Sequence, residues 1–261
     1  MLQTNNKRND VMTVLIREDK SGVVKLTLNR PDHFNTLSEA LLEALQRELD
    51  DIAQDDSVRC VVIAGSGRGF CAGHDLKEMR AHPQQSYYQD LFGRCGKVMQ
   101  SIVALPVPVI AKVHGIATAA GCQLAASCDL VIAASSARFA VSGIKLGLFC
   151  STPAVALSRS IAPKRAFDML VTGDFINADT AYDWGLVSQV VEEEELDQAV
   201  ADKVAKITEK SPDAIRFGKA MFYPQRQMAL SDAYAFAGDV MAENMMCQSA
   251  IDGIDGFLHK S

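Results

Sequence analysis

Hydrophobic and polar residues alternate between residues 23 and 28, so that Val24, Leu26 and Leu28 fall on one side of an extended chain. A period of two predicts a β-strand whose two faces differ. After a turn at 29–32, apolar residues recur every three or four positions from 41 to 52. This spacing predicts an amphipathic helix packed on a sheet, and segment 36–39 has the spacing of a capping box at its start.

Three short apolar runs follow, at residues 60–64, 109–113 and 130–133. Each lacks polar alternation, which is typical of a parallel strand buried on both faces. Between the last two runs, we interpret the small-residue segment 117–126 as a tight loop that enters a helix. Strands alternating with helical segments predict an α/β fold with a parallel sheet.

The last third of the chain changes character. Residues 196–209, 213–222 and 231–247 have helical patterns, with Pro212 and Pro224 as predicted helix stops. We therefore predict two regions: a β/α core over residues 10–190 and a helical C-terminal region over residues 191–261.

Composition agrees with a compact globular protein. The chain has 261 residues, of which 48% are hydrophobic and 22% are charged, values that argue against disorder and low complexity. The 26 Lys and Arg residues face 32 Asp and Glu residues, a net charge of −6. Since no basic stripe could neutralise phosphates along a duplex, we predict no nucleic-acid partner.

Cysteine usage and the N-terminus bear on location. The seven cysteines form no C-x-x-C pair and do not cluster with histidine at metal-ligand spacing, so no metal site is predicted. Residues 1–10 are polar and lack the apolar segment of a secretory signal. The longest apolar stretch, 102–111, is too short to span a bilayer. These features favour a reducing, cytoplasmic location without a membrane span.

Two Gly- and Ala-rich segments, 69–79 and 115–124, each follow a predicted buried strand. Gly73 permits a backbone turn that other residues resist, and the free N–H groups of a helix start attract negative charge. Two such N–H groups converging on one point would form an oxyanion hole. Clusters of small residues beside strands are more often close-packing devices, so the residues alone leave both interpretations open.

The order and content of these segments resemble the crotonase superfamily, that is the enoyl-CoA hydratase/isomerase family. The motifs that carry the resemblance are residues 28–31 (LNRP), 69–79 (GFCAGHDLKEM), 115–124 (GIATAAGCQL), 128–130 (CDL), Phe139, 146–148 (LGL) and 181–187 (AYDWGLV). The similarity runs from about residue 14 to residue 260, in the order typical of the family.

The resemblance implies a crotonase-type β/α spiral core with a C-terminal helical trimerisation region. It also implies acyl-CoA thioester substrates, with coenzyme A as part of the substrate and no permanently bound cofactor. By position, the two oxyanion-hole donors are the backbone N–H groups of His74 and Ala120. The implied assembly is a homotrimer or a dimer of trimers.

The resemblance also assigns residues to the coenzyme A moiety. Ala72, Asp75 and Leu76 correspond to positions near the adenine. Phe257 and Lys260 correspond to a C-terminal aromatic residue and a lysine that reach coenzyme A, in some members from a neighbouring subunit.

The chain departs from the family at the acid and base of hydration. Hydratases carry two glutamates that hold and deprotonate a water, at the positions that are Gln123 and Gly143 here. Glutamine has no proton-accepting carboxylate. Glycine has no side chain, and we expect it to leave open space there. Lys145 lies nearby in sequence, where a solvated charge is the more common role. We therefore predict weak or no hydratase activity.

His74 and Cys150 give a further comparison. A few decarboxylases of the family also have Ala-Gly-His-Asp at residues 72–75, with an aromatic hydroxyl near the position of Cys150. The His74 ring could orient a carboxylate or a water, or it could only fill the pocket wall. Segments 119–123 and 147–153 are most similar to a divergent branch of the family that also lacks both glutamates.

Three functions stay open on these residues. The first is an acyl-CoA enzyme that stabilises a thioester enolate with two backbone N–H groups. The second is a non-catalytic acyl-CoA binding or regulatory protein that kept the pocket and lost the chemistry. The third is a decarboxylase or thioesterase, which needs an oxyanion hole but no glutamate pair.

Overall fold

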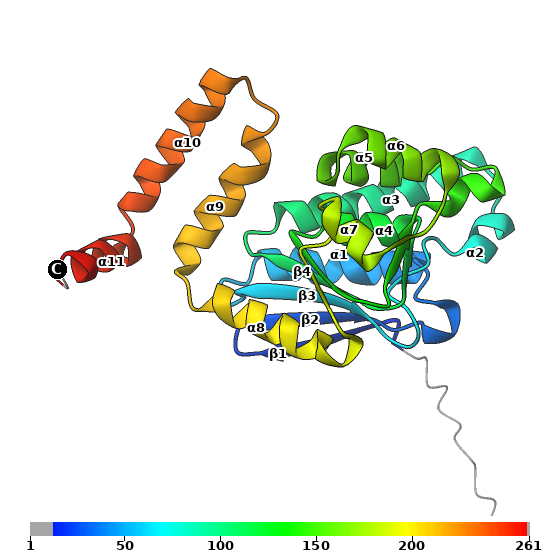
Figure 1. Ribbon diagram of the computed structural model, residues 1–261, viewed down its shortest axis with the longest axis horizontal. Helices are drawn as coiled ribbons and strands as arrows, with labels where there is room; N and C mark the ends of the chain where they lie inside the picture. Colours follow the sequence, from blue (N-terminus) through cyan, green and yellow to red (C-terminus); the bar gives the residue numbers. More distant parts are fainter. Residues whose placement is uncertain (1–12, 260–261) are drawn as a thin grey trace, which may run out of the picture.

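The computed structural model describes residues 13–259 and contains a six-stranded sheet in the order β1-β2-β3-β4-β6-β9 (Figure 1). Strands β1 (Leu15–Lys20) and β2 (Val23–Leu28) form an antiparallel hairpin. The next strands, β3 (Cys60–Gly65), β4 (Val109–Val113), β6 (Leu130–Ala134) and β9 (Gln189–Val191), continue the sheet in parallel. The predicted α/β fold with a parallel sheet is confirmed.

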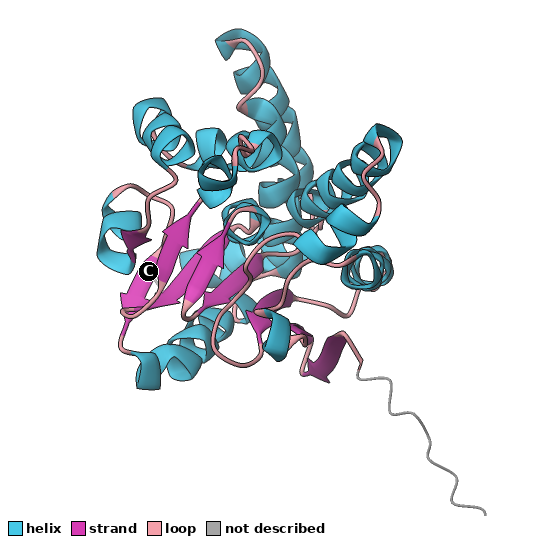
Figure 2. Cartoon of the chain, turned by 90° about the vertical axis from the view of Figure 1, so that its right-hand side faces the viewer, coloured by secondary structure: helices cyan, strands magenta, loops and turns pink. Residues whose placement is uncertain are grey.

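Both faces of this sheet are covered, as the unbroken apolar runs predict. Val61 and Ile63 of β3 pack in the larger core together with the buried face of α1 (Glu39–Ala53). Cys60 and Val62, on the other side of the same strand, pack in a smaller core with α8 (Leu196–Thr208). Figure 1 shows α1 and α8 on opposite sides of the sheet, and Figure 2 shows helices on both of its sides.

The start of α1 differs in detail from the capping box at 36–39. The cap is Ser38, whose hydroxyl accepts a hydrogen bond from the N–H of Leu41, and the helix begins at Glu39. Thr36 instead accepts a hydrogen bond from Arg30 through its side-chain oxygen. The helix therefore begins two residues later than a cap at Thr36 would place it.

A second sheet holds the short strands β5 (Ile116–Thr118), β7 (Arg138–Ala140) and β8 (Ile176–Asn177) in that order. Helix α4 (Ala120–Ser127) begins after a single residue beyond β5. Segment 117–126, interpreted as a loop that enters a helix, is therefore mostly helix.

The remaining elements of the main body are helical and lie around this sheet. They are the 3-10 helices η1 (Pro31–His33), η2 (Ser142–Leu146) and η3 (Glu193–Glu195), and the helices α2 (Leu76–Ala81), α3 (Gln85–Ala104), α5 (Ser151–Ser160), α6 (Pro163–Thr172) and α7 (Ala178–Asp183).

The predicted C-terminal helical region is present. Helices α9 (Pro212–Gln225), α10 (Leu230–Met245) and α11 (Gln248–Leu258) extend away from the sheet in Figure 1 and bury no residue within the single chain. Pro212 starts α9, where a missing N–H costs nothing. Pro224 was predicted to stop the helix, yet it lies inside the last turn. Only one intrahelical bond is lost so close to the end, so the helix continues to Gln225.

The predicted division at residue 190 stays a prediction. Strand β9 and helix α8 flank this position, and both pack on the main sheet. The helices whose side chains are all at least partly exposed begin at Pro212.

One buried polar cluster ties α9 to the main body. The ammonium group of Lys219 donates to Asp129 Oδ2 at 2.6 Å and to the carbonyls of Val107 and Ile102 at 2.9 and 3.1 Å. The hydroxyl of Tyr223 donates to the other oxygen of Asp129 at 2.6 Å. The Lys219 and Asp129 side chains are only 7% and 14% exposed. This cluster anchors α9 beside the first residues of β4 and β6.

Candidate active site

Segment 71–75 runs between two other stretches of chain, and this places the N–H of His74. Gly73 accepts a hydrogen bond from Leu37 through its carbonyl, and the N–H of Asp75 donates to the carbonyl of Leu37. In an extended chain successive N–H groups point to opposite sides, so the N–H of His74 points away from Leu37. It donates no hydrogen bond to any residue between 13 and 259.

The N–H of Ala120 is presented by a different device. Ala120 is the first residue of α4, so its N–H has no intrahelical acceptor. Ala119 before it has φ 51° and ψ −122°, a conformation that residues with a side chain rarely adopt. Strained backbone of this kind persists only where the surrounding structure holds it. Within the described chain, the Ala120 N–H has no hydrogen-bond acceptor.

The two N–H groups come from neighbouring turns. A Cβ on Gly73 would lie 2.9 Å from the Cβ of Ala119 and 3.3 Å from the nitrogen of Ala120. Gly73 also has φ +95°, so glycine is required there on both counts. A Cβ on Gly121 would lie 2.1 Å from the carbonyl oxygen of Cys71, so this second glycine serves close packing. The glycines of these two segments therefore allow close packing and also let the backbone present its N–H groups.

His74 is half-buried, with both of its ring nitrogens shielded from solvent. Its ring lies 5.4 Å from the ring of Phe92 on α3, between centroids. Burial lowers its pKa to about 4, and the carbonyl of Leu37 opposes this shift only weakly. Neither ring nitrogen has a hydrogen-bond partner of ordinary geometry among residues 13–259. The ring is therefore neutral at pH 7 and carries one N–H donor and one nitrogen acceptor.

We expect this histidine to make the folded protein sensitive to acid. Its pKa is about 4 in the folded chain and 6.5 in an unfolded one, so only the unfolded chain takes up a proton between these values. The free energy of unfolding should therefore fall by up to about 3 kcal/mol as the pH falls from 6.5 to 4. Urea denaturation at pH 7 and 4.5 measures this loss. His74→Phe should lose less stability over that range, and an equal loss in both proteins would contradict the assignment.

Gln123 lies one turn after Ala120 on α4, on the same side of the helix. It is only 4% exposed, and its side-chain oxygen Oε1 has no partner in the described part of the chain. Where hydratases of the resembled family carry a carboxylate, this chain therefore has a buried amide oxygen. That oxygen carries no charge and accepts no hydrogen bond from the described residues.

Gly143 does not leave the open space expected from its missing side chain. A Cβ there would lie 2.6 Å from the carbonyl oxygen of Leu148 and 2.7 Å from Sγ of Cys150. The carbonyl belongs to the backbone and cannot move alone. The chain past η2 turns back on itself through a hydrogen bond from the N–H of Leu148 to the Gly143 carbonyl, 3.0 Å long. That expectation is wrong because Leu148 and Cys150 fill the space.

Two other reactive side chains lie near Gly143. Lys145 is held in an ion pair, and Cys150 is a buried thiol. Lys145 pairs with Asp174 at 2.9 Å, and both side chains are more than half exposed. Burial raises the pKa of the Cys150 thiol, which is 7% exposed. Neither group is an activated base or nucleophile in this structure.

The residues assigned to coenzyme A fall into two separate places. Ala72 lies in segment 71–75, its N–H donating to the carbonyl of Phe34, and Leu76 is 50% exposed at the start of α2. Phe257 is 74% exposed on α11, at the opposite end of the molecule in Figure 1. Lys260 lies outside the described residues. One chain therefore does not bring Phe257 to Ala72, and a contribution from α11 requires a second copy.

Asp75 has a structural task of its own. Burial opposes its ionisation, but hydrogen bonds from Arg30 and from the N–H groups of Glu78 and Lys77 lower its pKa overall. The Arg30 contact is 2.9 Å long, and both side chains are mostly buried. Sequence reasoning missed Arg30 as a residue that holds this loop, although it lies in the LNRP motif.

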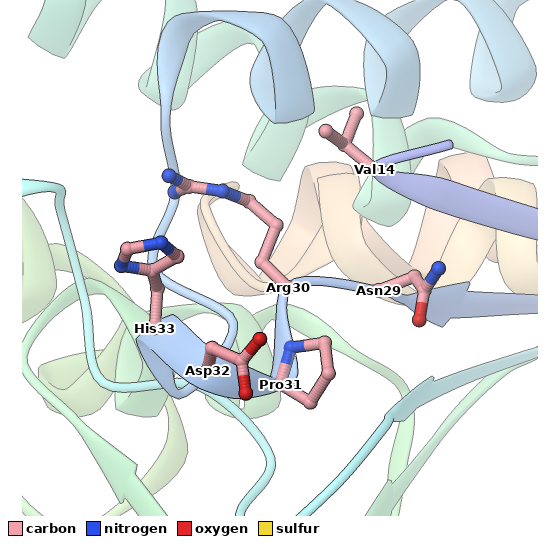
Figure 3. Close-up of a pocket in the computed structure, with 6 residues that line it drawn as sticks. All are labelled: Val14, Asn29, Arg30, Pro31, Asp32 and His33. Atoms are coloured by element: carbon pink, nitrogen blue, oxygen red, sulfur yellow. The ribbon is translucent and has the colours of Figure 1, made fainter. Parts of the chain in front are cut away.

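A shallow surface pocket of about 200 Å³ lies beside Arg30 (Figure 3). It is lined by Val14 and residues 29–33. None of the predicted site residues lines it. The candidate site is placed at His74 and Ala120 instead, because free N–H donors and unused buried polar atoms gather there. Among residues 13–259 no group of three His, Cys, Asp or Glu side chains is arranged to hold a metal ion, and no helix in that range is long and apolar enough to cross a membrane.

Comparison with known proteins gives the family. The enoyl-CoA hydratase/isomerase family model matches residues 18–261. Enoyl-CoA hydratase domain-containing protein 3 of Xenopus laevis is 42% identical over 249 residues, covering 95% of this chain and 84% of that protein. A crystal structure of an enoyl-CoA hydratase from Mycobacterium smegmatis is 57% identical with a TM-score of 0.94, covering 95% of this chain and 96% of that one. Human enoyl-CoA hydratase domain-containing protein 3 is 40% identical with a TM-score of 0.92, covering 95% and 98%.

The relatives correct the predicted location. The proteins of this name from frog, rat, mouse, human and zebrafish are all designated mitochondrial, so the prediction of a cytoplasmic protein is wrong by this comparison. The lack of an apolar secretory segment does not exclude a mitochondrial location, because mitochondrial targeting segments are amphipathic rather than continuously apolar.

These relatives are the divergent branch that segments 119–123 and 147–153 resemble, and the solved structures confirm the crotonase-type fold. With its fold, its two loops and nearly its whole length matched, this chain belongs to the enoyl-CoA hydratase/isomerase family.

Proposed function

We propose that this protein is an acyl-CoA thioester enzyme in which the backbone N–H groups of His74 and Ala120 bind the thioester carbonyl oxygen. The observation that carries the proposal is the pair of neighbouring N–H donors that have no acceptor among residues 13–259, one of them following a strained residue. Coenzyme A is part of the substrate, and no permanently bound cofactor is needed.

Two N–H donors act on the thioester in a definite way. Transfer of an α-proton to a base, or loss of an α-carboxylate as CO2, leaves the bonding electron pair on the α-carbon, and its delocalisation onto the thioester oxygen forms an enolate. Donors fixed in a site that excludes water stabilise that charge without having to reorient. Because the enolate oxygen is negatively charged and the substrate carbonyl oxygen is neutral, each N–H binds the enolate more strongly than the substrate. This difference lowers the barrier.

Coenzyme A would lie along segment 72–76, with α11 of a second copy completing the site. Ala72 and Leu76 supply the backbone and an exposed apolar side chain, while Asp75 holds the turn through Arg30. Phe257 would come from a neighbouring subunit, since α11 and α2 lie at opposite ends of one chain (Figure 1).

We expect Ala120→Pro to remove one donor while Ala120→Gly keeps it. Proline lacks the N–H and is best accepted at the first position of a helix. It also restricts the backbone of Ala119 before it, so a glycine variant and a stability measurement are needed beside it. The loss of one oxyanion donor costs on the order of 100-fold to 1000-fold in rate. The rate with the thioester that turns over best should fall by this factor in the proline variant and change little in the glycine variant.

A second readout does not depend on turnover. The absorbance of a bound conjugated thioester, such as a cinnamoyl-CoA, should shift to the red in wild type and less so in Ala120→Pro, because hydrogen bonds to the carbonyl polarise the chromophore. Thermal stability must be retained. Full activity and an unchanged shift in the proline variant would disprove the role of Ala120.

A non-catalytic acyl-CoA binding or regulatory protein is the second candidate. It is favoured by Gln123 and by the filled space at Gly143, which together leave the two glutamate positions without a carboxylate. Turnover of enoyl-, 3-hydroxyacyl-, malonyl- and methylmalonyl-CoA separates the two, because a binding protein should bind some of these by calorimetry and convert none. Decarboxylation or thioester hydrolysis in that panel would identify the third possibility. Absence of binding to every acyl-CoA would remove all three.

We expect the protein to assemble in threes, as a trimer or a dimer of trimers. The Met and aromatic residues of the C-terminal region could have covered the chain's own core, yet none of them is buried in α9 or α10. Several are largely exposed, including Met241 at 70%, Tyr234 at 74% and Met246 at 78%. So many exposed large apolar side chains in one helical region are typical of an interface. Light scattering at micromolar concentration measures the mass, and a 28.3 kDa monomer would overturn the expectation.

A further inference from the structure

We propose that Arg30 is a positioning residue for the oxyanion hole, because its guanidinium group joins the two stretches of chain between which the N–H of His74 is presented. It acts through Asp75 and Thr36 and not on the thioester itself. The inference rests on the proposed function, since it takes the N–H groups of His74 and Ala120 as the donors. It concerns a separate question, namely which side chain keeps the His74 donor in place.

Backbone hydrogen bonds hold the two sides of His74 unequally. Before it, the carbonyl of Gly73 accepts a hydrogen bond of 2.7 Å from the N–H of Leu37. After it, the N–H of Asp75 donates to the carbonyl of Leu37 over 3.4 Å, which is longer than usual for such a bond. His74 and Leu37 face each other in an isolated parallel bridge, outside the strands of both sheets. The chain just after His74 therefore needs a further support.

Arg30 supplies this support through the side chain of Asp75. Nη2 donates to Asp75 Oδ2 at 2.9 Å, while Nη1 donates to the carbonyl and the hydroxyl of Thr36 at 2.7 and 3.0 Å. Thr36 comes just before Leu37, and Asp75 comes just after the donor, so one guanidinium group spans both stretches of chain. Its planar fork holds two acceptors in a fixed geometry, which the compact ammonium group of a lysine does not provide.

The ion pair is largely shielded from water. The Arg30 and Asp75 side chains are only 16% and 11% exposed, so the pair is screened much less than one on the surface. The other carboxylate oxygen, Oδ1 of Asp75, accepts hydrogen bonds from the N–H groups of Lys77 and Glu78 at 3.0 and 3.4 Å and so caps α2. Asp75 therefore ties the residue after the donor both to the start of α2 and, through Arg30, to segment 36–37.

Without Arg30, the N–H of His74 should lose its fixed direction. A donor must stay aligned with the developing oxyanion, and a misplacement of about 1 Å can cost about 100-fold in rate. The N–H itself is retained, so the loss should not exceed that of a deleted donor. With the thioester that turns over best, kcat of Arg30→Met should fall about 10-fold to 100-fold on this basis. KM should change little, because the lost interaction belongs to the transition state.

Bound cinnamoyl-CoA reports on the same donor without turnover. With all of the thioester bound, its absorbance should shift less to the red in Arg30→Met and in Asp75→Asn than in wild type. Asp75→Asn keeps an oxygen to cap α2 and removes the ion pair. Because both changes break one bridge, the double variant should lose no more of the shift than either single variant. Calorimetry sets the saturating concentration for each variant, and thermal melting shows that each is folded.

The matched control is Arg17→Met on β1, away from the candidate site. Arg17 pairs with Glu48 at 2.9 Å, and the two side chains are 27% and 25% exposed, so this variant also loses a largely buried ion pair. It should keep the wild-type rate and the wild-type shift. Arg30→Lys keeps the positive charge without the fork, and it should behave like Arg30→Met.

Each outcome decides one question. A wild-type rate and shift in folded Arg30→Met and Asp75→Asn would overturn the inference, and a reduced shift in Ala120→Pro would then leave the proposed function standing. Full rescue by Arg30→Lys would overturn it in favour of a role for the charge alone. Additive losses in the double variant would also overturn it, because Arg30 and Asp75 would then act separately. Should no acyl-CoA bind to wild type more tightly than free coenzyme A, the inference and the proposed function fail together.

Discussion

Water addition to crotonyl-CoA is expected to be slower than about 0.001 per second with this protein. Hydration needs one group that takes a proton from water and one that delivers a proton to the α-carbon, and each is worth about 100-fold to 10,000-fold. Losing both groups should lower a typical turnover of about 10 per second by at least about 10,000-fold. Gln123 can hold a water but cannot take its proton, and no side chain stands at Gly143. Loss of enoyl-thioester absorbance measures the rate.

Glutamate substitutions at positions 123 and 143 should not by themselves restore the hydration rate. Gln123→Glu places a carboxylate on the α4 side that carries Ala120, yet it supplies only one of two groups. Gly143→Glu, alone or in the double variant, should lower the melting temperature, because the Leu148 carbonyl and Cys150 occupy the space its Cβ requires. Wild-type turnover near 10 per second would show that another residue transfers the proton. An active and stable double variant would show that segment 143–150 moves readily.

Replacing Lys219 by methionine is expected to cost about 3 to 5 kcal/mol of unfolding free energy. The change removes the cation from a mostly buried pair and leaves Asp129 with Tyr223 and the N–H of Val109 as its partners. A buried charge that loses its partner typically costs this much. The carbonyls of Ile102 and Val107 also lose a donor. Urea denaturation at one fixed protein concentration measures the loss.

Arg216 provides the matched control on the same helix. It pairs with Asp56, whose side chain is 93% exposed, so Arg216→Met should cost about 1 kcal/mol or less. The two variants remove one positive charge each from α9 and differ in burial. Equal, small losses in both would show that Lys219 does not anchor α9. A large loss in Lys219→Met should also reduce the fraction of the proposed trimer in light scattering, because α9 would no longer hold the exposed helices in place.

Local patterns predicted the central strands and first helix well. Val24, Leu26 and Leu28 are buried on one face of β2, and the apolar runs became β3, β4 and β6 with cores on both sides. These predictions succeed because a side chain's direction in a strand follows directly from its position, and burial then selects hydrophobic residues. Helix limits were less exact, since Ser38 rather than Thr36 caps α1 and α9 passes Pro224.

The sequence by itself determined the α/β class and, through its motifs, the family and the candidate residues His74, Ala120, Gln123 and Gly143. Only the tertiary structure decided what surrounds them. The absence of a side chain at Gly143 cannot reveal that Leu148 and Cys150 fill its space, because they return through a turn whose path depends on packing. Likewise, the letters His and Gln do not say whether their polar atoms have partners. Burial and hydrogen bonding depend on residues distant in the chain, and these keep His74 neutral and leave Gln123 Oε1 without a partner in the part of the chain that the structure describes.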